Sequence, residues 1–296
     1  MDIGVALPQM ARELDRDRVT AWCRGIDAGP YSSVSAGERI TFHNLEGITL
    51  CTAAAMLTER VRVFVNVAVA PWHAPAMLAK QLATMDVLSG GRVDLAVGVG
   101  GREQDYAALG SPFTRRHARV DETVAELKRL WAGGAAADGF TIGPTPVQAG
   151  GPPVLCSGMG PKSLARAAQW AAGVSGFALT GDAGEADRSF RAAEAAWAAA
   201  GRTDSPRLTT GVFVALGPDA EQTLRNFAMQ YLDVFGTDIA RMLAEAMTVH
   251  SPEALRSTID AMAATGCDEL ILVPADSDPA LLERITQVVG GATVGG

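Results

Sequence analysis

Two glycine-rich turns in this sequence bring together residue types that can bind an anion or a flat ring. The clearer one holds Ser157, Gly158, Met159 and Gly160, and it is followed by Pro161 and a helical pattern. Successive backbone N–H groups in such a turn can converge on a phosphate, at the positive end of the helix that follows. We therefore expect a phosphate site here, although a strand-to-helix turn without a ligand has the same pattern.

The second turn contains Gly98, Gly100 and Gly101 at the end of an apolar run. It fails as a G-x-G-x-x-G dinucleotide fingerprint, because its sixth position is Glu103. Glycines at a strand end also leave room for a flat ring against the backbone, or only permit a sharp turn. The first of these alternatives would place a cofactor ring near Gly100.

Residues that can move a proton follow other apolar runs. Glu38 and Arg39 come after residues 33–36, His43 lies close behind them, and His73 follows residues 61–67. A carboxylate at such a position can bind an N–H of a cofactor ring or transfer a proton, and a histidine can do so near neutral pH. The alternatives are a surface ion pair and structural histidines. Glu38 and His43 are the predicted catalytic candidates.

Motifs for other chemistries are absent from the sequence. It has no G-x-S-x-G or H-E-x-x-H motif, and its four cysteines are widely spaced. We expect no bound metal, no nucleophile, no disulfide framework and a reducing, cytoplasmic location.

The elements that must position these residues alternate regularly. Eight apolar runs, typical of buried parallel strands, are separated by amphipathic helical patterns. This alternation predicts a closed (β/α)₈ barrel, in one domain over residues 1–296, with a short hairpin within residues 133–153. The active site of such a barrel lies where its strands end. The runs are 3–7, 33–36, 61–67, 93–98, 153–157, 174–179, 208–216 and 269–273, and the helices are 16–28, 44–58, 75–88, 115–132, 161–172, 184–200, 218–248, 252–265 and 278–289.

Composition excludes several classes of protein. The chain has 296 residues, a net charge of -8 and 48% hydrophobic residues. The negative charge argues against a nucleic-acid partner, and no apolar run approaches the roughly 18 residues of a membrane span. The first residues read as a strand rather than a signal peptide.

Four segments together resemble the bacterial luciferase-like family of flavin and deazaflavin oxidoreductases, over nearly the whole chain. The most specific block is "HAPAMLAKQLATMDVLSGGR" (73–92), which lies within the matching segment 57–110. The others are "GPYSSVSAGERI" (29–40), "GGPPVLCSGMGPKSLARAAQWAAG" (150–173) and "SPEALRSTIDAMAATGCDELILVP" (251–274).

The resemblance implies a cofactor, reduced FMN or the deazaflavin F420, in the mouth of the barrel. Its phosphate would lie at residues 157–160, and a non-prolyl cis peptide at Asn66-Val67 would back its ring. Glu38 matches the acidic residue that F420-binding members place after the second strand, and Gln104 lies near a polar cofactor contact. Sugar-phosphate dehydrogenases of the family have a His and a Glu where this chain has Arg39 and Gly101, which argues against that activity.

Three functions follow from these observations. The first is an F420-dependent oxidoreductase that transfers a hydride between the deazaflavin and a small organic substrate. The amino-acid sequences of segments 29–40 and 66–75, which resemble the F420-linked branch of the family, favour this function. The second is a two-component monooxygenase that receives FMNH₂ from a flavin reductase. The third is a non-catalytic flavoprotein.

Two neighbouring helical patterns also predict a homodimer, in agreement with the resemblance. Residues 44–58 and 75–88 carry few charges on any face, whereas a barrel helix needs only one apolar stripe. The alternative is that other parts of the same chain cover them.

Overall fold

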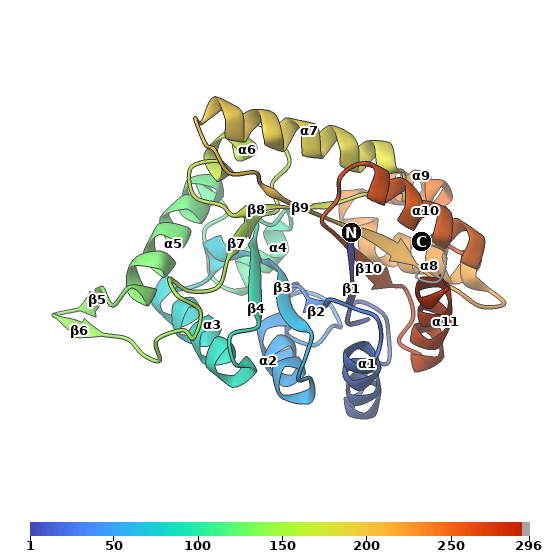
Figure 1. Cartoon of the computed structure of the whole chain (residues 1–296), viewed down its shortest axis with the longest axis horizontal. Helices are drawn as coiled ribbons and strands as arrows, with labels where there is room; N and C mark the ends of the chain where they lie inside the picture. Colours follow the sequence, from blue (N-terminus) through green and yellow to red (C-terminus); the bar gives the residue numbers. More distant parts are fainter. Residues whose placement is uncertain (292–296) are drawn as a thin grey trace.

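The computed structural model describes residues 1–291, and it confirms the predicted barrel. Eight parallel strands close in the order β1-β10-β9-β8-β7-β4-β3-β2, with helices around them (Figure 1). Each strand is largely buried on both faces, which explains the continuous apolar runs. The strands are β1 (Asp2–Ala6), β2 (Ser33–Ala36), β3 (Arg62–Ala68), β4 (Val93–Val97), β7 (Val154–Cys156), β8 (Gly173–Phe177), β9 (Arg207–Val214) and β10 (Glu269–Pro274).

Most helices also lie where the periodicity predicts them. They are α1 (Arg16–Ala28), α2 (Gly47–Leu57), α3 (Pro75–Ser89), α5 (Arg116–Trp131), α6 (Pro161–Ala167), α7 (Ala183–Ala199), α8 (Ala220–Leu232), α9 (Thr237–Ala246), α10 (Pro252–Ala264) and α11 (Pro279–Gly290). Short elements not predicted are η1 (Ala70–Trp72), α4 (Glu103–Ala108) and η2 (Asp233–Phe235).

The prediction of one helix over residues 218–248 was wrong. The segment is divided into α8, η2 and α9, and Gly236 between them has φ +95°, a backbone conformation that ends a right-handed helix. The break folds α9 back beside α8. A separate hydrophobic cluster fills the space between these helices and β9, and it includes Phe213, Phe227 and Leu232.

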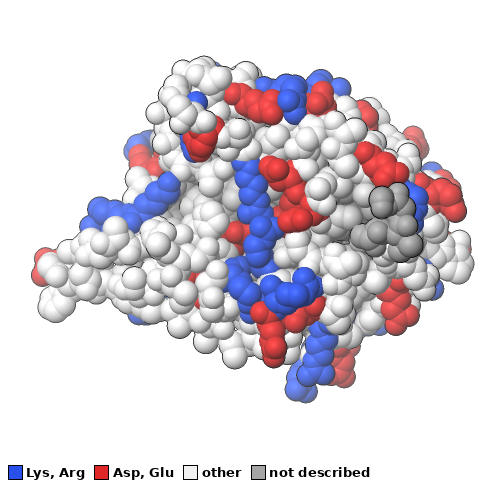
Figure 2. All heavy atoms as spheres, in the orientation of Figure 1, with Lys and Arg blue, Asp and Glu red and all other residues white. Residues whose placement is uncertain are grey.

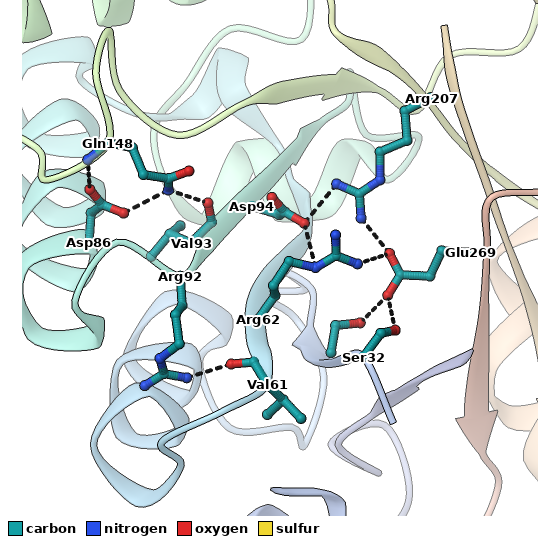
Figure 3. Close-up of polar contacts among 11 residues, drawn as sticks. Ser32, Val61, Arg62, Asp86, Arg92, Val93, Asp94, Gln148, Arg207 and Glu269 are labelled. Atoms are coloured by element: carbon teal, nitrogen blue, oxygen red, sulfur yellow. Dashed lines mark hydrogen bonds and ion pairs between the residues drawn. The ribbon is translucent and has the colours of Figure 1, made fainter. Parts of the chain in front are cut away.

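The predicted hairpin is present as β5 (Ala135–Ala137) and β6 (Phe140–Thr141), and it extends away from the barrel (Figure 1). Hydrogen bonds of Gln148 anchor the segment that follows the hairpin. The Gln148 side-chain amide donates to the buried Asp86 carboxylate (2.7 Å) and to the Val93 carbonyl (2.7 Å), and its backbone N–H donates to the other Asp86 oxygen (2.9 Å) (Figure 3). These bonds hold the long connection to α3 and β4.

A polar network closes the end of the barrel at which the strands begin. The Arg62 guanidinium lies 2.6 Å from the Glu269 carboxylate and 3.3 Å from that of Asp94, and Arg207 contacts both acids (Figure 3). Figure 2 shows a band of Lys and Arg side chains, with Asp and Glu beside it, across the centre of one face. This end of a barrel serves stability rather than catalysis.

Within the described part of the chain, no helix is long and apolar enough to cross a membrane.

Candidate functional site

A cavity of about 550 Å³ opens where the strands end. Its walls come from the ends of the barrel strands, β9 and β10 among them, and from loops after β1, β2, β3, β4, β7 and β8, while α8 and η2 close it from above. Much of the lining is glycine or apolar, including Gly98, Gly176, Phe177 and Phe213. Small-molecule sites in proteins have this size and this largely apolar character.

The peptide bond between Asn66 and Val67 is cis, as the resemblance implies, and both residues line the cavity. Gly37 packs directly on this bond, since a Cβ at Gly37 would lie 2.5 Å from the Asn66 carbonyl oxygen and 2.7 Å from the Val67 nitrogen. The Ser175 hydroxyl donates to the Asn66 side-chain oxygen (2.9 Å). This part of the wall is therefore held from β2, β3 and β8.

Glu38 also lines the cavity. It contacts His73, which the sequence did not favour over His43 as a catalytic candidate. Its carboxylate accepts from the Val69 N–H (2.7 Å) and lies 2.8 and 2.9 Å from Nε2 of His73. The Glu38 side chain is 2% exposed and that of His73 is 18% exposed. The pair thus connects the buried carboxylate in the cavity wall to the His73 ring, which is more accessible to solvent.

The same His73 nitrogen lies 3.0 Å from Nε1 of Trp72. A ring nitrogen carries either a hydrogen or a lone pair, so it cannot donate to Glu38 and accept from Trp72 at once. The contacts with Glu38 and Trp72 are therefore alternatives, which depend on whether Nε2 carries the hydrogen. The contact with Glu38 is the shorter one and is made to a carboxyl group, which favours a hydrogen on Nε2 that His73 donates to Glu38.

Gln9, which follows β1, carries an unpartnered polar atom into the cavity wall. Its side-chain N–H donates to the Gly37 carbonyl (2.5 Å), while its Oε1 is buried without a hydrogen-bond partner among the described residues. A buried acceptor left unpaired is costly, so a ligand with an N–H group would satisfy it.

The loop after β7 brings Ser157 and Met159 to the cavity, whereas Gly158 and Gly160 lie beside it and do not line it. The backbone N–H groups of Met159 and Gly160 donate to no acceptor within residues 1–291. Two adjacent free donors at the cavity edge are suited to an anion.

The structure thus brings most of the predicted site residues to one cavity, and leaves others outside. Glu38, Asn66, Val67, Gly100, Ser157 and Met159 line it. His43 is exposed, with its ring against Phe42, and Gln104 is exposed on α4; neither lines the cavity. Gln9 and Tyr231 line the cavity and were not chosen as site residues, whereas His73, one of the proton-transfer candidates, contacts Glu38. The position of Gln9 directly after a strand was the available signal.

A model of the family described as luciferase-like monooxygenase matches residues 2–289. The chain belongs to this luciferase-like family. Pyrimidine monooxygenase RutA of Escherichia coli O139:H28 is 31% identical over 140 residues, which are 44% of this chain and 35% of RutA. The match therefore spans about a third of that relative's length.

Two solved structures of similar fold have descriptions that name different cofactors. One is the coenzyme F420 dependent tetrahydromethanopterin reductase from Methanopyrus kandleri, with 15% identity, TM-score 0.73, and coverage of 98% of this chain and 99% of that one. The other is the oxygenating constituent of 3,6-diketocamphane monooxygenase from Pseudomonas putida in complex with FMN, with 17% identity, TM-score 0.71 and coverage of 98% of both. Identities this low show the shared fold.

The family is described as luciferase-like monooxygenase, so a flavin-type cofactor is the group whose fit to the cavity matters. The chain's own residues fit such a group, since the orphaned Gln9 oxygen and the glycine-lined walls leave an acceptor and space for a ring. No three His, Cys, Asp or Glu side chains of the described residues gather into a metal site.

Proposed function

We propose that this chain is an F420-dependent oxidoreductase that transfers a hydride between the deazaflavin and a small organic substrate. The observation that carries the proposal is the cavity in which Glu38, paired with His73, faces the Asn66-Val67 peptide. Two observations support the deazaflavin as the cofactor. The fold is shared with the F420-dependent reductase from M. kandleri, and the sequence around Glu38 resembles that of F420-binding family members.

Each residue has a proposed role in this site. Asn66 and Val67 back the ring, with Gly100 leaving room beside it, and Gln9 Oε1 accepts an N–H from the ring. In the loop that contains Ser157, Gly158, Met159 and Gly160, the free N–H groups of Met159 and Gly160 hold the phosphate. The bound deazaflavin supplies the two-electron hydride chemistry.

Proton transfer is assigned to the Glu38/His73 pair. The Glu38 carboxylate accepts a proton from the substrate, and His73 orients the carboxylate and exchanges protons with solvent from its more exposed side. His43, exposed and outside the lining, has no part in this mechanism.

A second candidate is a two-component monooxygenase that receives FMNH₂ from a flavin reductase. The family description and the FMN complex from P. putida favour it. In that case the apolar side chains of Phe177, Phe213 and Leu232, which line the cavity, would exclude water from the reacting ring.

We further propose that the protein works in the cytoplasm as a homodimer. All four cysteines are free and buried, as expected in a reducing compartment.

Titration of the purified chain with F420, FMN and reduced FMN tests the proposal. We expect one site that binds F420 at least about tenfold more tightly than either form of FMN. Tighter binding of reduced FMN would favour the monooxygenase, and binding of none of the three would contradict both.

A further inference from the structure

Two arginines beside the cavity have incomplete hydrogen bonding, and Arg102 is the one of the two that lines it. Arg39 follows β2 and is 8% exposed, and its Nε and Nη1 have no partner among the described residues. Arg102 precedes α4 and lines the cavity, and its Nε is also buried without a partner. Buried guanidinium donors normally find acceptors, so these atoms require an explanation.

The ring of Tyr231, on α8, brings the two arginines together. The guanidinium carbon of Arg102 lies 5.1 Å from the centre of this ring and that of Arg39 lies 5.5 Å from it. Tyr231 itself lines the cavity, and Arg102 donates to its backbone carbonyl (3.2 Å). Loops after β2 and β4 and the helix after β9 therefore place two positive charges around one aromatic ring.

These charges are not neutralised within the described residues. Neither arginine forms an ion pair there. Asp105 is the acid whose charge acts on Arg39, but its Oδ1 accepts from both the backbone N–H (2.7 Å) and the hydroxyl of Thr41. Burial, followed by repulsion from Arg102, lowers the pKa of Arg39 to about 10, which still leaves it charged at neutral pH. A bound anion would relieve both the repulsion and the unpaired donors.

We propose that Arg39 and Arg102 form an anion subsite that binds a carboxylate or phosphate group of the organic substrate. The assignment to the substrate rests on the proposed function, which places the cofactor phosphate at the loop after β7. The physiological substrate is then a small anionic molecule with an apolar body. That body would pack against the aromatic side chains of Phe177, Phe213 and Tyr231 in the cavity lining.

Benzoate and its neutral counterpart benzamide are suitable probes, because they share a shape and differ in charge. Calorimetric titration of the full chain, with and without bound cofactor, is expected to give benzoate about tenfold or more tighter binding than benzamide. Arg39→Gln and Arg102→Gln are expected to weaken benzoate about tenfold while leaving benzamide within about twofold. Arg241→Gln, an exposed change on α9, is the control and should alter neither.

Equal binding of the two probes, or unchanged benzoate binding in folded Arg102→Gln, would overturn the subsite. Arg102→Lys keeps the charge and should retain discrimination between the probes if Arg102→Gln is unstable. The same variants titrated with F420 separate the sources of the anion: a loss of about tenfold in cofactor affinity would overturn the assignment to the substrate. Failure of the proposed function would appear differently, as wild-type protein that discriminates the probes but binds no cofactor.

Discussion

At the scale of single residues, the Glu38/His73 contact is the feature on which proton transfer depends. Each side chain is a hydrogen-bond partner of the other, so removal of one takes a hydrogen bond from the polar group that stays behind. We expect Glu38→Gln and His73→Gln each to lower the free energy of unfolding by about 1–3 kcal/mol, and the double variant to cost about 1 kcal/mol less than the sum. Urea unfolding of the four proteins measures this coupling. Strict additivity would show that the two side chains do not interact.

The orphaned oxygen of Gln9 leads to a binding prediction. Gln9→Met keeps the side-chain volume but removes the acceptor, so the dissociation constant for F420 should rise about tenfold. The free energy of unfolding should fall by only about 1 kcal/mol, through loss of the bond to Gly37. Gln104→Met is the matched control on exposed α4. If fluorescence titration shows the larger loss for Gln104, the ring site lies nearer α4 than we propose.

Among the elements, the approach of β2 to β3 at the cavity depends on a missing side chain. A Cβ at Gly37 would meet backbone atoms of Asn66 and Val67 that cannot move aside cheaply. Gly37→Ala should lower the unfolding free energy by about 2 kcal/mol or more and weaken cofactor binding. Gly101→Ala meets no atom within 4 Å and should change stability by less than about 0.5 kcal/mol. Thermal unfolding of both variants decides this, and equal effects would contradict the packing argument.

The opposite ends of the strands carry a pH-dependent contribution to stability. Burial alone would raise the pKa of Glu269, but Arg62, the hydroxyls of Ser32 and Ser33, and Arg207 together hold it below its ordinary value. Because the unfolded chain then binds more protons, this stabilisation is complete above the unfolded pKa of about 4.3 and is lost as pH falls below it.

Substitution of this acid separates its contribution from general acid denaturation. Glu269→Gln leaves two arginines short of a partner and should cost about 3 kcal/mol at pH 7. Its unfolding free energy should also fall less steeply than that of wild type between about pH 5 and pH 3. Urea unfolding across this range provides the measurement. Parallel curves for the two proteins would mean that Glu269 does not carry the dependence.

The sequence predicted elements better than it predicted contacts between them. Apolar runs placed all eight barrel strands within a few residues, because burial on both faces leaves a local signal. The break at Gly236 was missed, since a single glycine within a helical pattern is also tolerated. His73 could not be chosen over His43 locally. Its partner Glu38 is 35 residues away, and the barrel alone brings the two together.

At the scale of the whole molecule, α2 and α3 expose large apolar side chains that no other described element covers. The exposed fractions are 63% for Met56, 58% for Met77 and 44% for both Val87 and Leu88. Apolar side chains gathered on neighbouring helices are typical of a protein interface. They agree with the predicted homodimer.

Light scattering at micromolar concentration tests that assembly. We expect a mass of twice 30.8 kDa for wild type, and a mass of 30.8 kDa for Met77→Glu, which would bury a charge in the interface. Phe140→Glu, on the protruding hairpin, is the control and should remain dimeric. A wild-type mass of 30.8 kDa would reject the dimer.

Under the proposed function, the cavity at the strand ends holds the ring of a deazaflavin. A crystal structure of the chain soaked with F420 tests this most directly. We predict ring density against the Asn66-Val67 peptide with an N–H within hydrogen-bond distance of Gln9 Oε1, and phosphate density at residues 157–160. Ring density outside this cavity, or an empty cavity in protein that binds F420 in solution, would contradict the account.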